Sequence, residues 1–305
     1  MATPIVSAYI DMLAVWYPPE QVIASITKYI GKVNHLILAF WENTGPVDVA
    51  LAWSNGTFPS DAIDEFHSLG VKVMVSAGGG TASTVITENP TGGRSYGEAL
   101  GTWARDQKLD GVDFDIEDNY MFQNKPQTAI QWMVDATQGV KSAFPDAIIS
   151  HAPQAPYFSP VYGNGPYLSI NQQAGNDIDF YNIQFYNQGS SSYDTYTSLF
   201  VTSNGWATGT AVGQLVQAGV PLDKIVVGKP VTPADAANTG YVPASEFAAM
   251  IEQAGQNNLL PAGAMGWQFR SDAGMVNWST ELYDALSGVS STNAVPQALR
   301  MAKKD

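Results

Sequence analysis

Short runs of β-branched and apolar residues recur along the chain, and longer segments with apolar residues at helical spacing separate them. The expected strands are Ile5–Ile10, His35–Phe40, Val71–Ser76, Gly111–Asp115, Ala147–His151, Asp179–Phe185, Lys224–Gly228 and Ala262–Trp267. The expected helices are Pro19–Tyr29, Asp61–Leu69, Tyr96–Leu109, Thr128–Phe144, Thr208–Ala218 and Ser245–Gln256. Strands that alternate with helices indicate parallel pairing. The pattern therefore predicts an α/β fold, a single (β/α)8 TIM barrel.

The connections between these elements differ in length. The links from helix to strand are short, and glycines such as Gly70 and Gly111 end a helix just before a strand. The links from strand to helix are long, and in a barrel these loops build the active site. Because no break in composition divides the chain, we expect a catalytic barrel over residues 1–289 and a C-terminal tail over residues 290–305.

The charge of the chain limits its partners. The 305 residues include 28 acidic and 14 basic side chains, a formal net charge of −14. A largely negative surface repels a phosphate backbone, so nucleic acid is not an expected partner. No run of about 18 apolar residues predicts a membrane span. We expect a monomer that binds a neutral ligand.

The sequence says less about the cellular compartment. It contains no cysteine, which excludes disulfides, and its first residues lack the features of a signal peptide. An extracellular location, with any signal removed, is favoured, and a cytoplasmic location stays open. The triplets that begin at Asn55 and Asn277 match the glycosylation pattern, which is too common by chance to decide between these locations.

The segment 110–117, Asp-Gly-Val-Asp-Phe-Asp-Ile-Glu, carries the strongest chemical signal. Side chains alternate between the two faces of a strand, so Asp113, Asp115 and Glu117 share one face and the apolar residues between them share the other. The apolar face is expected to pack against helices, which points the three acids into the barrel. Buried neighbouring carboxylates repel one another and cannot all be ionised near neutral pH. A general acid needs a raised pKa, and Glu117, nearest the barrel mouth, is the natural candidate.

Two other interpretations of this acidic row stay open. The carboxylates are also suited to a hard cation such as Mg²⁺ or Ca²⁺, or to a hydrogen-bonded structural group. We favour catalysis without a metal ion or cofactor.

Most glycosidases place two carboxylates on opposite sides of the scissile bond. Here Asp115 and Glu117 lie on the same side, and Asp235 is the best remaining candidate for a protein nucleophile. The alternative is a nucleophile supplied by the substrate, whose 2-acetamido oxygen attacks the anomeric carbon. In that case Glu117 acts as the acid, Asp115 orients the acetamide N–H, and Tyr186 holds the acetamide oxygen.

These residues resemble the family 18 glycoside hydrolases. Residues 110–117 match the family signature Asp-Gly-x-Asp-x-Asp-x-Glu in full, and residues 76–79 match its Ser-x-Gly-Gly signature. Tyr9 and Trp267 also fall where that family places functional aromatic side chains. The resemblance runs from Tyr9 to Trp267, and it implies a TIM barrel that binds an oligosaccharide or glycan containing N-acetylglucosamine.

Two further segments, residues 152–156 and 184–187, look like the hevamine-like branch, which includes plant class III and related fungal enzymes. The chain departs from that branch because it has no cysteine. The segment 9–13 also differs from the usual end of the first strand, which affects the expected contacts with sugar there.

The resemblance implies a role for each matching residue. Glu117 is then the acid and base, Asp115 positions the acetamide, and Asp113 shares a proton with Asp115 with support from Tyr9 and Ser76. The substrate-binding residues implied are Gln184, Tyr186, Asn187 and Trp267, which forms the floor of the site, together with Phe40, Gly78, Gly79 and Gln154.

Three functions stay open at this point. The first is a retaining endo-chitinase that cuts β-1,4-linked N-acetylglucosamine by substrate-assisted catalysis. The second is an endo-β-N-acetylglucosaminidase that cuts the chitobiose core of N-glycans. The third is a non-catalytic, chitinase-like carbohydrate-binding protein.

Other residues carry weaker signals. Residues 77–80 are more typical of close backbone contact than of a phosphate loop, because the P-loop lysine is missing. His35 and His67 are expected to be structural, whereas His151 is a candidate for substrate contact. Aromatic side chains in the loops after strands, among them Tyr120, are suited either to packing or to sugar faces.

Overall fold

The computed structural model describes residues 3–11, 19–43, 45–191 and 193–288. Its strands are β1 (Ile5–Ile10), β2 (His35–Glu42), β3 (Gly45–Pro46), β4 (Lys72–Gly78), β5 (Gly111–Asp115), β6 (Ile148–His151), β7 (Phe180–Gln184), β8 (Ile225–Pro230) and β9 (Gly263–Trp267). They follow the order β1-β9-β8-β7-β6-β5-β4-β2-β3, and the pairing of β1 with β2 closes the sheet. Every pairing is parallel except that of the short β3 with β2. The predicted (β/α)8 barrel is confirmed.

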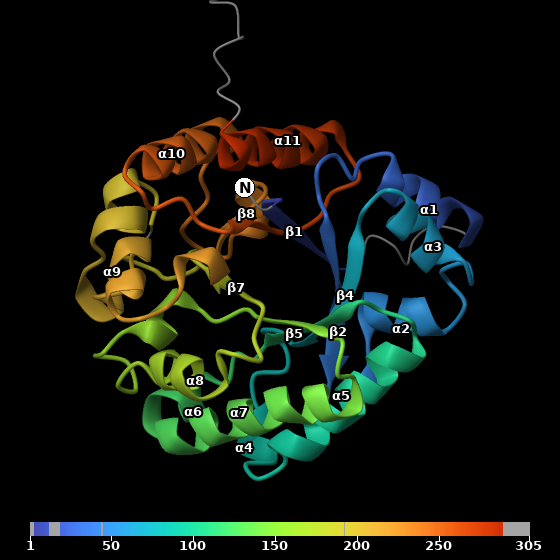
Figure 1. Cartoon of the computed structure of the whole chain (residues 1–305), viewed down its shortest axis with the longest axis horizontal. Helices are drawn as coiled ribbons and strands as arrows, with labels where there is room; N and C mark the ends of the chain where they lie inside the picture. The colour runs from blue at the N-terminus through green and yellow to red at the C-terminus, as the bar shows by residue number, and fades with distance from the viewer. Residues whose placement is uncertain (1–2, 12–18, 44, 192, 289–305) are drawn as a thin grey trace, which may run out of the picture.

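Helices form a ring around the strands (Figure 1). They are α1 (Pro19–Thr27), α2 (Asp48–Ser54), α3 (Ala62–Ser68), α4 (Val85–Glu88), α5 (Gly93–Asp106), α6 (Asn119–Asn124), α7 (Pro126–Ala143), α8 (Pro166–Ala174), α9 (Val212–Gln217), α10 (Ala244–Gln256) and α11 (Ala273–Ser287). Short helical turns add η2 (Ala155–Phe158), η3 (Thr197–Val201), η4 (Gly205–Ala207), η5 (Leu222–Lys224) and η6 (Pro233–Asp235). None of the described helices is long and apolar enough to cross a bilayer.

The predicted helix at Thr208–Ala218 is shorter than expected. The buried hydroxyl of Ser203 accepts a hydrogen bond from the backbone N–H of Thr210 at 2.8 Å, and the Thr210 hydroxyl donates to the carbonyl of Ala207 at 2.6 Å. These bonds hold the backbone before residue 212 in a loop. Helices α2, α4, α6, α8 and α11 were not among the expected elements, and the expected tail at residues 290–305 lies outside the described part of the chain.

Alternation along β5 divides its side chains between two environments. Val112, Phe114 and Ile116 belong to the large apolar core between the strands and the surrounding helices. Asp113 is fully buried on the opposite, inner face. The predicted separation of the acidic and apolar faces is therefore present.

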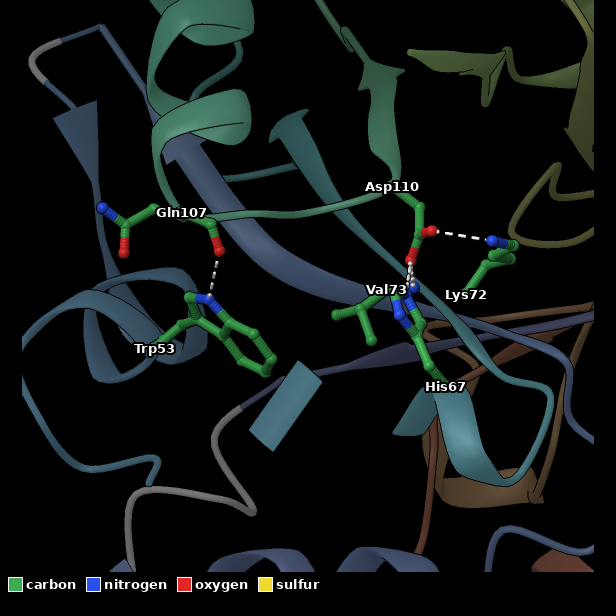
Figure 2. Close-up of polar contacts among 6 residues, drawn as sticks. All are labelled: Trp53, His67, Lys72, Val73, Gln107 and Asp110. Carbon is green, nitrogen blue, oxygen red and sulfur yellow. Dashed lines mark hydrogen bonds and ion pairs between the residues drawn. The ribbon is translucent and has the colours of Figure 1, made fainter. Parts of the chain in front are cut away.

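Asp110, the first residue of the acidic segment, ties the start of β5 to its neighbours rather than serving the barrel mouth (Figure 2). Its carboxylate accepts hydrogen bonds from the Val73 backbone N–H at 2.8 Å and from the Lys72 ammonium at 2.9 Å, and it lies 2.8 Å from His67 Nε2. Burial raises the pKa of Asp110, but these contacts outweigh it and bring the pKa below its usual value. His67 is therefore structural, as expected.

Candidate active site

A cavity of about 390 Å³ lies at the carboxyl ends of the strands. Of the residues expected at the substrate site, the cavity lining includes Phe40, Asp115, Glu117, Gln154, Gln184, Tyr186, Asn187 and Trp267. The lining also includes Asp11, Asp48, Gly80, Thr81 and Gln188, which were not predicted from the sequence. The other expected residues do not line the cavity themselves. They are Tyr9, Ser76, Gly78, Gly79 and Asp113.

Asp113 lies inside the barrel and is enclosed by hydrogen-bond donors. One carboxylate oxygen accepts from the hydroxyls of Tyr9 and Ser76, each at 2.8 Å. The other accepts from the Ser150 hydroxyl at 2.5 Å and from the Asn182 amide at 3.3 Å. Burial raises the pKa of Asp113 above its usual value, although the four donors act in the opposite direction.

Asp115 lies one layer nearer the barrel mouth and is 5% exposed. Burial raises the pKa of its carboxyl well above the usual value, and the negative charges of Glu117 and Asp113 raise it further. The Gln184 amide, which donates to Asp115 at 2.7 Å, opposes this rise. The pKa is therefore raised at both buried members of the row, Asp113 and Asp115, and burial is the main cause at each.

Glu117 lies two residues beyond the end of β5, so only two of the three acids belong to the strand itself. Its side chain is half-buried in the cavity wall. The Gln154 amide donates to one Glu117 oxygen at 2.8 Å, and the Gln184 amide donates to the other at 3.3 Å. Gln184 therefore links Glu117 to Asp115.

Two glycines allow the ends of β4 and β5 to approach each other. Gly78 has a φ of +105°, and a Cβ there would lie 2.3 Å from the carbonyl oxygen of Asp115. The backbone N–H of Gly79 donates to the same carbonyl at 2.7 Å, and a Cβ at Gly79 would touch the Phe40 ring at 3.0 Å. The Ser-x-Gly-Gly segment thus provides the close backbone contact that the sequence analysis favoured.

Aromatic side chains pack together around Trp267, at the end of β9. The Trp267 ring lies 5.8 Å from the Tyr9 ring and 6.1 Å from the Phe40 ring. Tyr186 is buried, and this burial, together with the nearby Asp115 charge, raises the pKa of its hydroxyl well above the usual value. Tyr186 therefore retains its proton at neutral pH and can act as a hydrogen-bond donor.

Asn187 lines the cavity, but its side-chain carbonyl faces the protein. That oxygen accepts from the backbone N–H groups of Ala237 and Asn238 at 2.8 and 3.2 Å. These bonds hold the loop after β8 against the end of β7. Only the amide NH₂ of Asn187 remains to meet a sugar.

His151 does not reach the cavity, which corrects the expectation of substrate contact. It is fully buried on the outer side of the barrel, between the rings of Phe114 and Tyr167, and Nε2 lies 3.1 Å from the Thr137 hydroxyl. Burial lowers the pKa of His151 to about 3, so the ring is neutral. His35 likewise contacts the neighbouring Asn34 amide at 2.8 Å and is structural.

Asp235 is also absent from the cavity lining. Its carboxylate accepts from the backbone N–H and the hydroxyl of Thr232 at 2.9 and 2.7 Å. Arg270 lies 3.7 Å from its other oxygen. The Asp235 carboxylate thus bonds within its own helical turn. The carboxylates that line the cavity besides Asp115 and Glu117 are those of Asp11 and Asp48.

No three histidine or acidic side chains among the described residues are arranged to hold a metal ion. The two oxygens of Asp113 are instead satisfied by hydroxyl and amide donors. The cavity therefore presents an acid at its wall, a buried carboxyl with a raised pKa beneath it, and amide, phenol and indole groups around them. On the active-site face of a TIM barrel, this set of groups is that of a glycoside hydrolase.

The chain matches the family model described as "Glycosyl hydrolases family 18" over residues 10–293, and it therefore belongs to that family and is a glycoside hydrolase. The acidic endochitinase SE2 of Beta vulgaris is 27% identical over 70% of this chain and 68% of its own length. The endochitinase of Saccharomyces cerevisiae is 30% identical over 60% of this chain and 30% of its own length. Plant and fungal enzymes of this kind agree with the branch that the sequence predicted.

Solved structures agree with the fold. A family 18 chitinase from Pseudoalteromonas aurantia is 25% identical, covers 92% of this chain and 99% of its own, and superposes with a TM-score of 0.74.

The chain spans 64% of the acidic endochitinase of Arabidopsis thaliana, to which it is 29% identical.

Proposed function

We propose that the protein is a retaining endo-chitinase that hydrolyses β-1,4 linkages between N-acetylglucosamine units by substrate-assisted catalysis. The observation that carries the proposal is the pairing of Glu117 with Asp115. The two acids lie side by side, are bridged by the Gln184 amide, and share one cavity with the Tyr186 hydroxyl. The relatives that bear the name endochitinase support the same substrate.

In the first step, Glu117 donates its proton to the glycosidic oxygen as the bond to the anomeric carbon breaks. The acetamide oxygen of the same sugar forms a bond to that carbon, which gives an oxazolinium ion. Asp115 accepts a hydrogen bond from the acetamide N–H and stabilises the positive charge that develops there. The Tyr186 hydroxyl, which retains its proton, donates to the acetamide oxygen and fixes its line of attack.

In the second step, the ionised Glu117 removes a proton from a water molecule that attacks the anomeric carbon. The ring of the oxazolinium ion opens, the acetamido group is restored, and the product has the configuration of the substrate. Trp267, on β9, forms the floor beneath the reacting sugar. Because β5 and β9 are four places apart in the closed eight-strand ring, Glu117 and Trp267 face each other across the mouth.

Asp113 acts from below this reaction centre. Its four donors stabilise its charge, and that charge raises the pKa of Asp115. When Asp115 turns toward the substrate, its proton is left between the two aspartates. This role follows from the enclosed position of Asp113, which no substrate atom reaches.

The test uses two substrates in parallel, chitohexaose and a high-mannose glycopeptide, with products identified by mass spectrometry. We expect the hexamer to be cut to dimers, trimers and tetramers, and fresh reducing ends to appear as the β-anomer by NMR. The Glu117→Gln variant, which keeps the shape of the side chain, serves as the matched control for contaminating activity.

Each other outcome leads to a different conclusion. Release of a glycan that leaves one N-acetylglucosamine on the peptide, with the hexamer intact, identifies an endo-β-N-acetylglucosaminidase. Fresh α-anomers contradict the retaining mechanism. Binding of both substrates without cleavage identifies a carbohydrate-binding protein.

A further inference from the structure

Three of the six large apolar side chains that are most exposed on the described residues lie in the connections after three consecutive strands. Tyr120, in the loop region after β5, is 58% exposed, Val161 after β6 is 63% exposed, and Trp206 after β7 is 40% exposed. Loops that follow the strands of a barrel lie on its active-site face. We call these three residues the Trp206 surface.

The Trp206 surface is built onto the segment that carries the catalytic acid. The Tyr162 ring, adjacent to Val161 in sequence, packs against the Trp206 ring with their centres 6.1 Å apart. The Tyr162 hydroxyl donates to the backbone and side-chain oxygens of Asn119, at 3.1 and 3.0 Å. The backbone N–H of Asn119 in turn donates to the carbonyl of Glu117 at 2.8 Å. The surface is therefore continuous with the wall of the cavity.

Hydrogen bonds join the loops beneath this surface to one another. Tyr157 is fully buried, and its hydroxyl donates to the same Asn119 side chain at 3.1 Å. The Ser159 hydroxyl donates to the carbonyl of Thr208 at 2.8 Å, which joins the loop after β6 to the loop that carries Trp206. The loop that carries Trp206 is thus joined to its neighbour before any ligand binds, which reduces the entropy cost of binding at the Trp206 ring.

The position of the surface relative to Glu117 identifies which part of a substrate it meets. Trp267 lies on β9, opposite β5 in the ring of strands, whereas the Trp206 surface follows β5, β6 and β7. In the proposed mechanism, a sugar that rests on Trp267 directs its glycosidic oxygen, and the chain beyond it, toward Glu117. The surface therefore lies on the leaving-group side of the cleavage point.

We infer that Tyr120, Val161 and Trp206 bind the N-acetylglucosamine units on the leaving-group side of a chitin chain. Flat aromatic rings suit the apolar faces of pyranose rings, and a neutral polymer is not repelled by an acidic protein. This inference rests on the proposed chitinase function. It adds a binding surface outside the cavity and a preference for long chains.

The test compares Trp206→Ala and Tyr120→Ala with the wild type. Leu69→Ala is the matched control, because Leu69 is 48% exposed but lies where α3 turns into β4, at the opposite end of the barrel. The substrates are chitotriose and a chitohexaose labelled with ¹⁸O at its reducing end. The readouts are the ratio of hexamer to trimer cleavage rates and the lengths of the labelled products.

We expect each aromatic variant to lower the hexamer-to-trimer rate ratio about 3- to 10-fold, because a lost aromatic contact typically weakens binding by that factor. The labelled product should also become shorter, since fewer sugars are held beyond the cleavage point. The control should match the wild type in both readouts.

An unchanged ratio with unchanged labelled products would overturn the inference while leaving the chitinase function intact. A lower ratio with longer labelled products would also overturn it, because the lost contacts would then lie on the other side of the bond. If the wild type and the Leu69→Ala control cut neither oligomer, the proposed function itself fails.

Discussion

Replacement of Lys229 by methionine should change how the stability of the barrel depends on pH. Lys229 is in β8 and is fully buried. Its amine donates to the backbone carbonyl of Phe185 at 2.9 Å and to that of Tyr193 at 2.6 Å. Burial lowers the pKa of Lys229 from 10.5 to about 7, although the charge of Asp194 opposes the change.

The sign of the effect follows from proton linkage. Between the folded pKa near 7 and the unfolded pKa near 10.5, the unfolded chain binds a proton at Lys229 that the folded protein does not. Stability therefore rises with pH in that window, by about 1.4 kcal/mol per pH unit at its steepest. The Lys229→Met variant lacks this dependence. The free energy of unfolding of the wild type, relative to the variant, should increase by about 2 kcal/mol from pH 7 to pH 9.

The assay is urea unfolding of both proteins at pH 7, 8 and 9 and constant ionic strength, followed by tryptophan fluorescence. Loss of the hydrogen bonds to Phe185 and Tyr193 adds a difference between the two proteins, but that difference does not vary with pH. Parallel pH profiles for wild type and variant would show that Lys229 has an ordinary pKa, and would refute the reasoning.

Three further predictions address the site. Glu117→Gln should lower turnover about 100-fold or more while chitotriose still binds by calorimetry, and near-normal turnover would refute the acid assignment. Gly78→Ala should destabilise the fold by about 1–3 kcal/mol in urea unfolding, more than Gly219→Ala, because a Cβ at Gly219 meets open space whereas one at Gly78 meets the backbone of β5. A thiazoline mimic of the oxazolinium ion should inhibit the enzyme competitively, and Asp11→Asn and Asp48→Asn should each lower turnover less than Glu117→Gln does. Indifference to the mimic, or a larger loss in either aspartate variant, would point to a protein nucleophile.

The barrel could be predicted from sequence because its strands are short, apolar and evenly spaced. The prediction failed where tertiary contacts decide the local structure. Ser203 and Thr210 look like ordinary surface residues in sequence, yet their buried hydroxyls hold the chain before α9 in a loop. Strand β2 runs on to Glu42 because Gly45–Pro46 folds back and pairs with its end, a contact that β-propensity does not reveal.

The acidic row could be predicted because alternation along one strand assigns its faces. The same rule contained the signal that excludes His151. Ser150 points inward to Asp113, so its neighbour His151 must point outward. Asp235 carried a signal too, since Thr232 and Asp235 have the spacing with which an acid caps a helical turn.

Asp11 and Asp48 could not be predicted in the same way. Asp11 directly follows β1 and Asp48 begins α2, positions where no periodicity indicates which way a side chain points. The structure brings them into the cavity only through the closure of β1 onto β2 and the turn that begins α2. Loop residues of this kind become visible only once the fold is known.

The order of burial along the acidic row explains how one strand supports groups with different tasks. Asp113 is fully enclosed and bonded to four donors, Asp115 is barely exposed, and Glu117 is half-buried at the cavity wall. Burial penalises charge most at the bottom of the row, and the donors around Asp113 offset that penalty there. Asp115 has fewer such donors and an acid on either side, so the proton is held most firmly at the middle position. In the proposed mechanism, this proton stays between Asp113 and Asp115 when Asp115 turns toward the substrate, and Glu117, at the end nearest the substrate, exchanges protons with the glycosidic oxygen and with water.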